Sequence, residues 1–345
     1  MEPLYQTILN DLKEKILSGT LQPGSQVPTE KELSDRYQVS RITSKRALTE
    51  LEQLGLIERT RGKGSFVKKS TQKKLTTKRI LFLLPFSNDL SLGNFSEGLL
   101  PIVQAEKFEV MMTNFDFLTS HHANEITQEF DGLIYYADDE NQHLDLLFEL
   151  SLQQFPTIIL DKQLHDLNLP AIYSDNSAGG QVACDYLIAL GHQKIAYIFG
   201  NDRLPQSTRQ RYLGYIRSTS EHQLSFHTTL EDQRATLNNL LEYVTTNQIT
   251  ALVCENDLVA IEAMRILKQG GLQLPEKLSV IGFDNIQAAA LVDPSLTTIS
   301  QNFKEIGALA GQALITWITT GQVPDSQKVA IHLITRQSTK ELIHD

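Results

Sequence analysis

From residue 79 onward, short apolar runs alternate with amphipathic stretches, and this alternation restricts the fold more than any other feature of the sequence. Such alternation predicts βαβ units with right-handed crossovers, and therefore parallel sheets flanked by helices. About 265 residues is large for one such sheet, so we expect an α/β region of two lobes. The strand-like runs are 80–86, 108–115, 132–136, 157–160, 195–199, 251–254, 279–283 and 297–300. The helical stretches include 93–105, 178–190, 237–246, 258–268 and 303–319.

The domain boundaries follow from where this pattern begins. Residues 69–78 are polar and have no apolar periodicity, which is typical of an exposed linker. The expected domains are 1–68, 69–78 as the linker, and 79–345, with one lobe at about 79–161 and 291–320 and the other at about 162–290 and 321–345.

The first 68 residues have the pattern of a winged helix-turn-helix, an α+β head. Apolar residues keep helical spacing in three segments. Thr29 followed by Glu32 is a capping-box pattern that starts the second helix, and Ser40 can cap the third. Residues 56–59 and 65–67 then have the pattern of two short strands. Three helices and a two-stranded hairpin in so short a segment predict this fold.

Charge is divided unevenly between the two regions. The net charge of the chain is −10, but residues 1–79 carry +7 and the remainder −17. A basic head on an acidic body indicates that the head meets a polyanion. The alternative explanation for this positive charge is a basic tail that binds no partner, and only motifs within the head can distinguish the two.

The sequence also indicates the compartment. Cys184 and Cys254 lie about 70 positions apart without the spacing of a metal or redox motif, so reduced thiols are expected. The N-terminus has no apolar core of a signal peptide, and no apolar run reaches the ~18 residues of a membrane span. We therefore expect a cytoplasmic protein with no membrane partner.

The third helix and the hairpin tip concentrate groups that bind DNA. The first residues of a recognition helix enter the major groove, where Arg41 can bind guanine O6 and N7 together. The hydroxyls of Ser40 and Thr43 suit phosphate contacts. Arg61 and Lys63 lie on a glycine-containing tip that can approach the DNA backbone. A solvated helix face with an ordinary turn is the alternative, which the order of these features disfavours.

Motifs in the head resemble the GntR family of bacterial repressors. These motifs are Pro28–Leu33, Val39–Arg41, Ala47–Leu48, Leu54–Ile57 and Gly62–Val67. The resemblance implies binding to double-stranded operator DNA. Lys45 replaces an arginine common in the family, and because lysine lacks the planar fork of arginine, we expect a phosphate contact there. The DNA-binding positions that it implies are Lys31, Ser40, Arg41, Thr43 and Lys45, with the wing at Arg61, Gly62 and Lys63.

In the second region, polar residues follow several of the predicted strands. Ligands of open α/β sheets bind at the carboxyl ends of the strands. Carboxylates and amides bind vicinal hydroxyl groups, and aromatic rings cover the apolar side of a sugar. The polar residues are Ser87, Asn88, Asp161, Asn256 and Asp284, and the aromatic candidates are Phe86, Tyr136 and Phe303.

The same region resembles the LacI/GalR-type effector domain, which has the periplasmic-binding-protein fold. The motifs are Asp175–Gly180, Leu190–Ala196, Arg211–Tyr215, Ser279–Asn285 and Leu296–Ile299. A GntR head on such a body resembles the arabinose-responsive repressors of Gram-positive bacteria, which implies a sugar effector such as L-arabinose. The effector positions that the resemblance implies are Asp161, Arg211, Asn256, Asp284 and Gln301.

We therefore expect a homodimeric repressor that a small sugar releases from a palindromic operator, without enzymatic activity or cofactor. GntR heads also occur on aminotransferase-like bodies, but the few lysines beyond residue 79 lie in no Schiff-base setting. A purine corepressor that strengthens DNA binding is the second hypothesis. His121 and His122 lack a second pair of metal ligands, so no metal site is expected.

Several candidates have a simpler interpretation. Asn256 could serve only to cap the helix that follows it, and Asp161 and Asp284 could be solvated loop acids. Gly180 is expected to be a packing glycine. Trp317 lies on an apolar helix face and is expected in the core or an interface.

Overall fold

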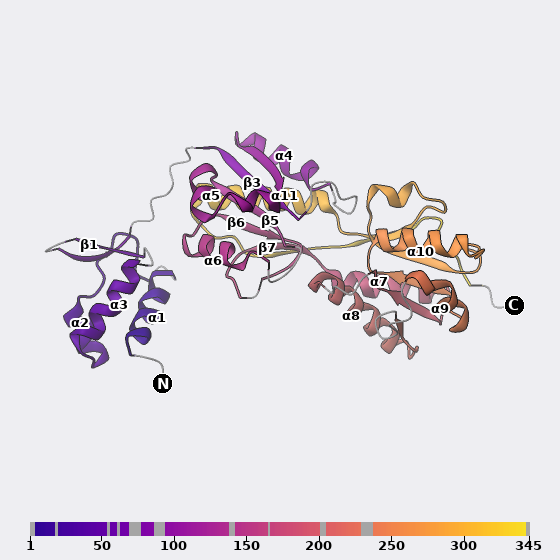
Figure 1. The fold of residues 1–345 in the computed structure, drawn as a ribbon, viewed down its shortest axis with the longest axis horizontal. Helices are drawn as coiled ribbons and strands as arrows, with labels where there is room; N and C mark the ends of the chain where they lie inside the picture. The colour runs from indigo at the N-terminus through magenta and orange to yellow at the C-terminus, as the bar shows by residue number, and fades with distance from the viewer. Residues whose placement is uncertain are drawn as a thin grey trace. The chain divides into compact units, whose positions relative to one another are not determined.

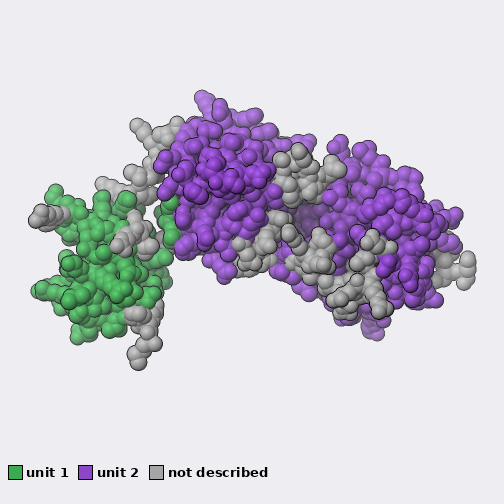
Figure 2. All heavy atoms as spheres, viewed as in Figure 1, with its two compact units in different colours: residues 1–76, 152–154 green, residues 77–151, 155–345 purple. Residues whose placement is uncertain are grey.

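The computed structural model describes residues 4–17, 20–53, 56–60, 63–68, 77–85, 94–137, 142–164, 166–200, 205–228 and 237–342. Two compact units are present: residues 1–76 with 152–154, and residues 77–151 with 155–345 (Figure 2). Within the described part of the chain, no helix is long and apolar enough to cross a membrane.

The first unit contains the predicted winged helix-turn-helix (Figure 1). Its elements are α1 (Leu4–Leu17), α2 (Glu30–Tyr37), α3 (Arg41–Gln53) and an antiparallel hairpin of β1 (Ile57–Thr60) and β2 (Gly64–Val67). The predicted capping box is confirmed, since Thr29 N donates to the Glu32 carboxylate at 2.7 Å and Glu32 N donates to Thr29 Oγ1 at 3.3 Å. The three helices and the hairpin share a small core, which includes Ile8, Leu12, Leu33, Leu48, Leu51, Ile57 and Val67.

The first lobe of the second unit has a parallel sheet in the order β13–β7–β6–β5–β3–β4. The central strands β3, β5 and β6 are buried along most of their length, as expected where helices cover a parallel sheet, whereas the edge strands β4 and β13 are more open. The strands are β3 (Arg79–Leu84), β4 (Glu109–Asn114), β5 (Gly132–Tyr136), β6 (Thr157–Leu160), β7 (Ala171–Ser174) and β13 (Gln327–Val329). The helices are α4 (Phe95–Ala105), η1 (Phe115–Thr119), α5 (Ala123–Glu129), α6 (Leu144–Leu152) and α11 (Phe303–Thr320).

The second lobe has a sheet in the order β14–β12–β11–β10–β8–β9, in which only β14 is antiparallel to its neighbour among the described strands. The strands are β8 (Ile195–Ile198), β9 (His227–Thr228), β10 (Ala251–Cys254), β11 (Ser279–Asp284), β12 (Thr297–Ser300) and β14 (His332–Ile334). The helices are α7 (Asn176–Ala189), α8 (Gln206–Glu221), η2 (Leu237–Asn239), α9 (Leu240–Thr246), α10 (Asp257–Gln269) and η3 (Gln287–Ala290).

Side chains of one strand alternate between the two faces of this second sheet. Ile195 and Tyr197 of β8 belong to the core under α7 and α8, whereas Ala196 and Ile198 belong to the core under α9 and α10. Since successive side chains of a strand point to opposite faces, a continuous apolar run is what a sheet covered on both sides requires. The prediction of two helix-covered α/β lobes is confirmed.

The lobes divide at other residues than those predicted. β7 pairs with β6 in the first sheet, although residues 162–290 are expected in the second lobe. β12 pairs with β11 in the second sheet, although residues 291–320 are expected in the first lobe, and β13 lies in the first sheet rather than the second. The boundaries are wrong because main-chain hydrogen bonds to strands distant in sequence assign a strand to a sheet, and an isolated apolar run does not reveal them.

Each lobe contains a pair of helices that approach closely at glycines. Between α4 and α11, a Cβ on Gly98 would lie 1.8 Å from Lys304 O. Between α7 and α8, a Cβ on Gly180 would lie 1.9 Å from Arg211 O, and one on Gly214 would also meet the backbone of α7. Gly180 is therefore a packing glycine, as expected, and its missing side chain lets the backbone at Arg211 lie against α7.

We predict that Gly180→Ala destabilises the second unit by about 1–3 kcal/mol, because neither helix backbone can move aside without disturbing the core. Thermal unfolding of the whole chain measures the loss. Gly270→Ala is the matched control, since the one close contact of its Cβ would be the end of the flexible Leu241 side chain at 2.5 Å, with the nearest backbone atom, Leu267 O, at an ordinary 3.4 Å. Equal losses from the two substitutions would contradict the role assigned to Gly180.

Candidate functional site

The first turn of α3 presents polar side chains to solvent. Arg41 and Lys45 are exposed, whereas Ser44 and the apolar residues that follow are buried. Thr43 N donates to Ser40 Oγ at 3.2 Å, so the predicted cap is confirmed, and the two hydroxyl oxygens lie 2.9 Å apart. The two hydroxyls are thus already ordered where the helix begins.

A groove of about 460 Å³ lies between α3, the start of α2 and the hairpin. Lys31 and Arg41 line it together with Arg59, which is held by Glu52 at 3.3 Å and by Glu30 at 3.7 Å. Lys63 is exposed at the hairpin, whereas the candidates Arg61 and Gly62 lie outside the described residues. Five of the proposed DNA-binding residues (Lys31, Ser40, Arg41, Thr43 and Lys45) therefore lie around the start of α3 or the groove beside it.

In the second unit, the candidate site is organised around Arg211 of α8, whose residue surface is only 6% exposed. Its Nε donates to Asn176 Oδ1 at 2.8 Å, and its Nη1 donates to the Glu255 main-chain oxygen at 2.7 Å. Its Nη2 lies 3.2 Å from Asp284 Oδ1, and its guanidinium lies 3.9 Å from the centroid of the Phe283 ring. Contacts from α7, from the residue directly after β10 and from β11 therefore fix the orientation of this side chain.

Two carboxylates at strand ends have left-handed backbone conformations. Asp284, at the end of β11, has a φ of 111°, and Asp161, directly after β6, has a φ of 77°. Such values strain residues with a side chain; they occur at turns and helix caps, as at Gln38, and also cluster at functional sites. Gln301 Nε2 donates to Asp284, and Lys162 Nζ lies 3.5 Å from Asp161 Oδ2. Both carboxylates are therefore presented by a constrained backbone and held by a polar partner.

Burial changes the ionisation of the acids in this region. It raises the pKa of Asp284 to about 6, although Arg211 and Gln301 favour the charged form. Burial also raises the pKa of Glu255 to about 7 and that of Asp257 to about 7. Within the described structure, Glu255 Oε2 is buried without a hydrogen-bond partner.

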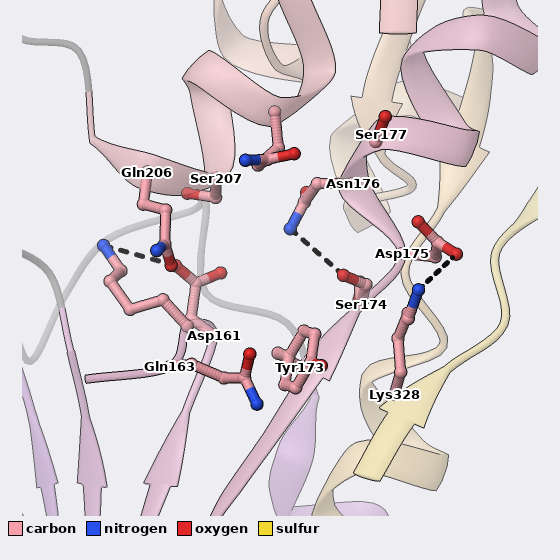
Figure 3. Close-up of a pocket in the computed structure, with 12 residues that line it drawn as sticks. Asp161, Gln163, Tyr173, Ser174, Asp175, Asn176, Ser177, Gln206, Ser207 and Lys328 are labelled. Atoms are coloured by element: carbon pink, nitrogen blue, oxygen red, sulfur yellow. Dashed lines mark hydrogen bonds and ion pairs between the residues drawn. The ribbon is translucent and has the colours of Figure 1, made fainter. Parts of the chain in front are cut away.

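A polar cavity of about 240 Å³ lies where the ends of β6 and β7 meet the first turns of α7 and α8 (Figure 3). Asp161 and Tyr173 contribute from the first lobe, and Asn176, Ser207 and Gln210 from the second. Asn176 connects this cavity to Arg211. Tyr173 is the single aromatic residue among the described residues that line it.

The charges around the cavity are paired. Lys162 faces Asp161 at 3.5 Å in the cavity lining. Arg211 and Asp284 do not line the cavity, but they pair at 3.2 Å and are connected to it through Asn176. At the rim, Lys328 lies 3.1 Å from Asp175. Such a site offers hydrogen-bond donors and acceptors with little net charge. Among the residues the structure covers, no cluster of three or more His, Cys, Asp or Glu could hold a metal ion.

The other predicted effector residues have different surroundings. Tyr136 packs against Phe95 with ring centroids 5.9 Å apart, and Phe95 also packs against Phe303 at 4.9 Å. Asn256 Oδ1 accepts a hydrogen bond from Val259 N at 2.8 Å, so the capping role considered for it is present. The candidates Phe86 and Ser87 lie outside the described residues, as does Asn88.

Sequence reasoning missed three residues of this region. Asn176 and Glu255 contact Arg211 over 35 and 44 positions of sequence, and the Glu255 contact uses a main-chain atom that leaves no trace in the sequence. Lys162 is only 2% exposed beside Asp161. Its position immediately after a predicted strand end is the signal that could have identified it.

Comparisons with known proteins agree with this architecture. Residues 4–67 match the family described as "Bacterial regulatory proteins, gntR family", and residues 184–339 match the "Periplasmic binding protein-like domain". The chain is 28% identical to the arabinose metabolism transcriptional repressor of Geobacillus stearothermophilus, over 99% of this chain and 98% of that protein.

Two further similarities cover only part of this chain. The ribose operon repressor of Haemophilus influenzae is 32% identical, over 54% of this chain and 57% of that protein. The crystal structure of a LacI family transcriptional regulator from Enterococcus faecium with bound ribose superposes with a TM-score of 0.65. It is 23% identical and covers 77% of this chain and 100% of its own, which supports the fold alone.

We predict that Glu255 makes the stability of the second unit depend on pH. Its pKa rises from the usual 4.5 to about 7 in the folded chain, so the folded state favours the neutral acid. The contribution of Glu255 to the free energy of unfolding is therefore fully present below pH 4.5, and it is lost as the pH rises through 7. Between pH 5 and 8, the wild type should lose up to about 3 kcal/mol relative to Glu255→Gln.

Denaturant unfolding of the whole chain at several pH values measures this difference. Glu276→Gln is the control, because Glu276 is exposed and its substitution should leave the pH profile of the wild type unchanged. Parallel pH profiles for the wild type and Glu255→Gln would contradict the assignment.

Proposed function

We propose that this chain, a GntR-type DNA-binding head joined to a periplasmic-binding-protein-like domain, is a transcriptional repressor that a neutral sugar releases from its operator. The observation that carries the proposal is the buried Arg211, held with Asp284 beside a polar cavity, in a chain whose head exposes a basic recognition helix. The named relatives repress arabinose metabolism and the ribose operon, so pentoses such as L-arabinose are the first effectors to test.

On the head, α3 is the recognition helix and the hairpin is the wing. Arg41 reads a base in the major groove, while Lys31, Ser40, Thr43 and Lys45 hold phosphates, and Lys63 acts from the wing. The support is that Lys31, Arg41, Lys45 and Lys63 are exposed, and that α3 rests on a packed core, so its first turn is held rigidly.

The effector is a neutral polyol rather than an anionic sugar or a purine. The support for a neutral ligand is the pairing of Arg211 with Asp284 and of Lys162 with Asp161. An anionic ligand would have to displace one of these buried carboxylates. A purine binds best between two aromatic faces, and Tyr173 alone among the described lining residues offers one. The purine hypothesis is therefore not favoured.

The repressor acts as a homodimer, which places its two heads on adjacent half-sites of a palindromic operator and transmits ligand binding to them. A sugar that contacts both lobes favours the closed arrangement and shifts the spacing of the heads. Such coupling is typically worth about 1–3 kcal/mol, so a saturating sugar should change operator affinity by roughly 5- to 150-fold. We propose that the sugar lowers operator affinity, so that the repressor is released from DNA.

We predict that Arg41→Ala weakens operator binding by about 1–3 kcal/mol and relaxes base preference, because one bidentate contact is lost. Lys63→Ala should instead weaken all DNA sequences alike and reduce the salt dependence by about one charge. Titrations of matched and mutated operators at several salt concentrations distinguish the two. If Arg41→Ala, like Lys63→Ala, weakened binding to all DNA sequences equally, the base-reading role proposed for Arg41 would be wrong.

We predict that one neutral pentose or hexose raises the melting temperature of the whole chain by several degrees. A ligand at 100 times its Kd adds about 2.7 kcal/mol of stability to the state that binds it. A thermal-shift screen of neutral sugars, sugar acids, disaccharides and purines tests this, followed by operator titration with the compound that stabilises most. Stabilisation by a purine that also tightens operator binding would overturn the proposal.

Asp284→Asn identifies the site in the same assay. Asparagine keeps an oxygen beside Arg211 but removes the charge, so sugar affinity should fall at least about tenfold. Because the substitution removes one charge of a buried ion pair, it should also lower the melting temperature without sugar, so the sugar response is measured relative to the sugar-free variant. Operator binding without sugar, measured below that melting temperature, should be unchanged, since the head is untouched. Asp293→Asn is the matched control, because the Asp293 side chain is 93% exposed. A wild-type response in Asp284→Asn would place the effector elsewhere.

A further inference from the structure

The outward face of α3 carries an apolar side chain that the cationic contacts do not explain. Ile42 is 80% exposed, in the first turn of the helix. The buried face of α3 consists of Ser44, Ala47, Leu48 and Leu51. At 3.6 residues per turn, Ile42 lies almost directly opposite the centre of that face. It therefore points away from the core of the head, where a recognition helix meets its target.

Ile42 is more exposed than the other large apolar side chains that the structure describes in the head. Leu4, in the first turn of α1, is 62% exposed, and no other large apolar side chain among the described residues of the head is as open as Ile42. Isoleucine is also a poorer helix former than arginine, lysine, glutamine or glutamate, any of which would suit an exposed helix position. Neither packing nor helix propensity accounts for isoleucine here.

The residues around Ile42 indicate what covers it. Around the helix axis, the exposed Arg41 and Lys45 lie on one side of Ile42 and Arg46, whose side chain is 61% exposed, lies on the other. Arg46 is also held within the head, by Glu50 at 3.2 Å and over the ring of Tyr5. A single apolar side chain among three cations suits a polyanion that presents one apolar group between its charges. The major groove of DNA is such a surface, because thymine alone of the four bases carries a methyl group on its exposed edge.

We propose that Ile42 reads the C5-methyl group of a thymine in each operator half-site. Arg41 and Lys45 bring the first turn of α3 to the base edges, and the Ile42 side chain then excludes water from the methyl group. This inference rests on the proposed function, since it requires a specific operator. It adds a base-specific contact that is apolar and therefore insensitive to salt, beside contacts that are cationic.

Thymine-to-uracil substitution tests this, because uracil lacks only the methyl group. The full-length protein without added sugar first selects its operator from random duplexes. Each thymine of the half-site is then replaced by uracil. At one position we expect the wild type to lose about fourfold in affinity, which corresponds to about 0.8 kcal/mol for one buried carbon. Ile42→Ser should show no loss there, and Ile42→Val should keep most of it.

Leu4→Ala is the matched control, an exposed apolar residue of the same head, and it should keep the wild-type uracil penalty at every position. Two results would overturn the inference: no thymine whose methyl group matters to the wild type, or a uracil penalty that persists in Ile42→Ser. Failure to select any operator would instead overturn the proposed function, so the two failures are distinguishable.

Discussion

The ion pair between Arg211 and Asp284 is the interaction on which the rest of the second unit depends. A guanidinium that is 6% exposed must be compensated, since removing one partner of a buried ion pair is strongly destabilising. The compensation comes from three elements, through Asn176 of α7, the main chain of Glu255 after β10, and Asp284 of β11. These contacts require α7 and α8 to lie close together, which the glycines between them permit. The close packing of α7 against α8 and the contacts of Arg211 therefore depend on each other.

The same residues lie where the chain passes between the lobes. It crosses after β7, after β12 and between β13 and β14. Ser174 Oγ, at the first crossing, lies 3.4 Å from the Gln301 main-chain oxygen, at the second, and Asn176 Nδ2 donates to Ser174 O at 3.3 Å. Groups that would contact a sugar are thus hydrogen-bonded to the segments on which the lobes would turn. A ligand that draws these groups together favours one arrangement of the lobes, which is what an effector must do.

The sequence alone is sufficient for the architecture and for part of the site. The alternation of apolar runs predicts two helix-covered parallel sheets because the signal is local and repeated. Asp161 and Asp284 can be identified because each directly follows a strand that the sequence predicts. By contrast, β7 ends in a polar residue after only three apolar ones, and β13 contains a single apolar residue, so neither forms a recognisable apolar run. The contacts of Arg211 with Asn176 and Glu255 join residues far apart in sequence. The sequence also indicates that Asn256 can cap the helix that follows it, but it does not show which main-chain NH group the side chain accepts from.

Operator binding and sugar binding are proposed to be coupled through one chain, and reciprocal titration tests this coupling most directly. Operator affinity is measured without and with saturating sugar, and sugar affinity without and with saturating operator, all on the full-length protein. We predict that both affinities fall by one common factor, between roughly 5 and 150. A sugar that binds in the cleft and leaves operator affinity unchanged would contradict the account.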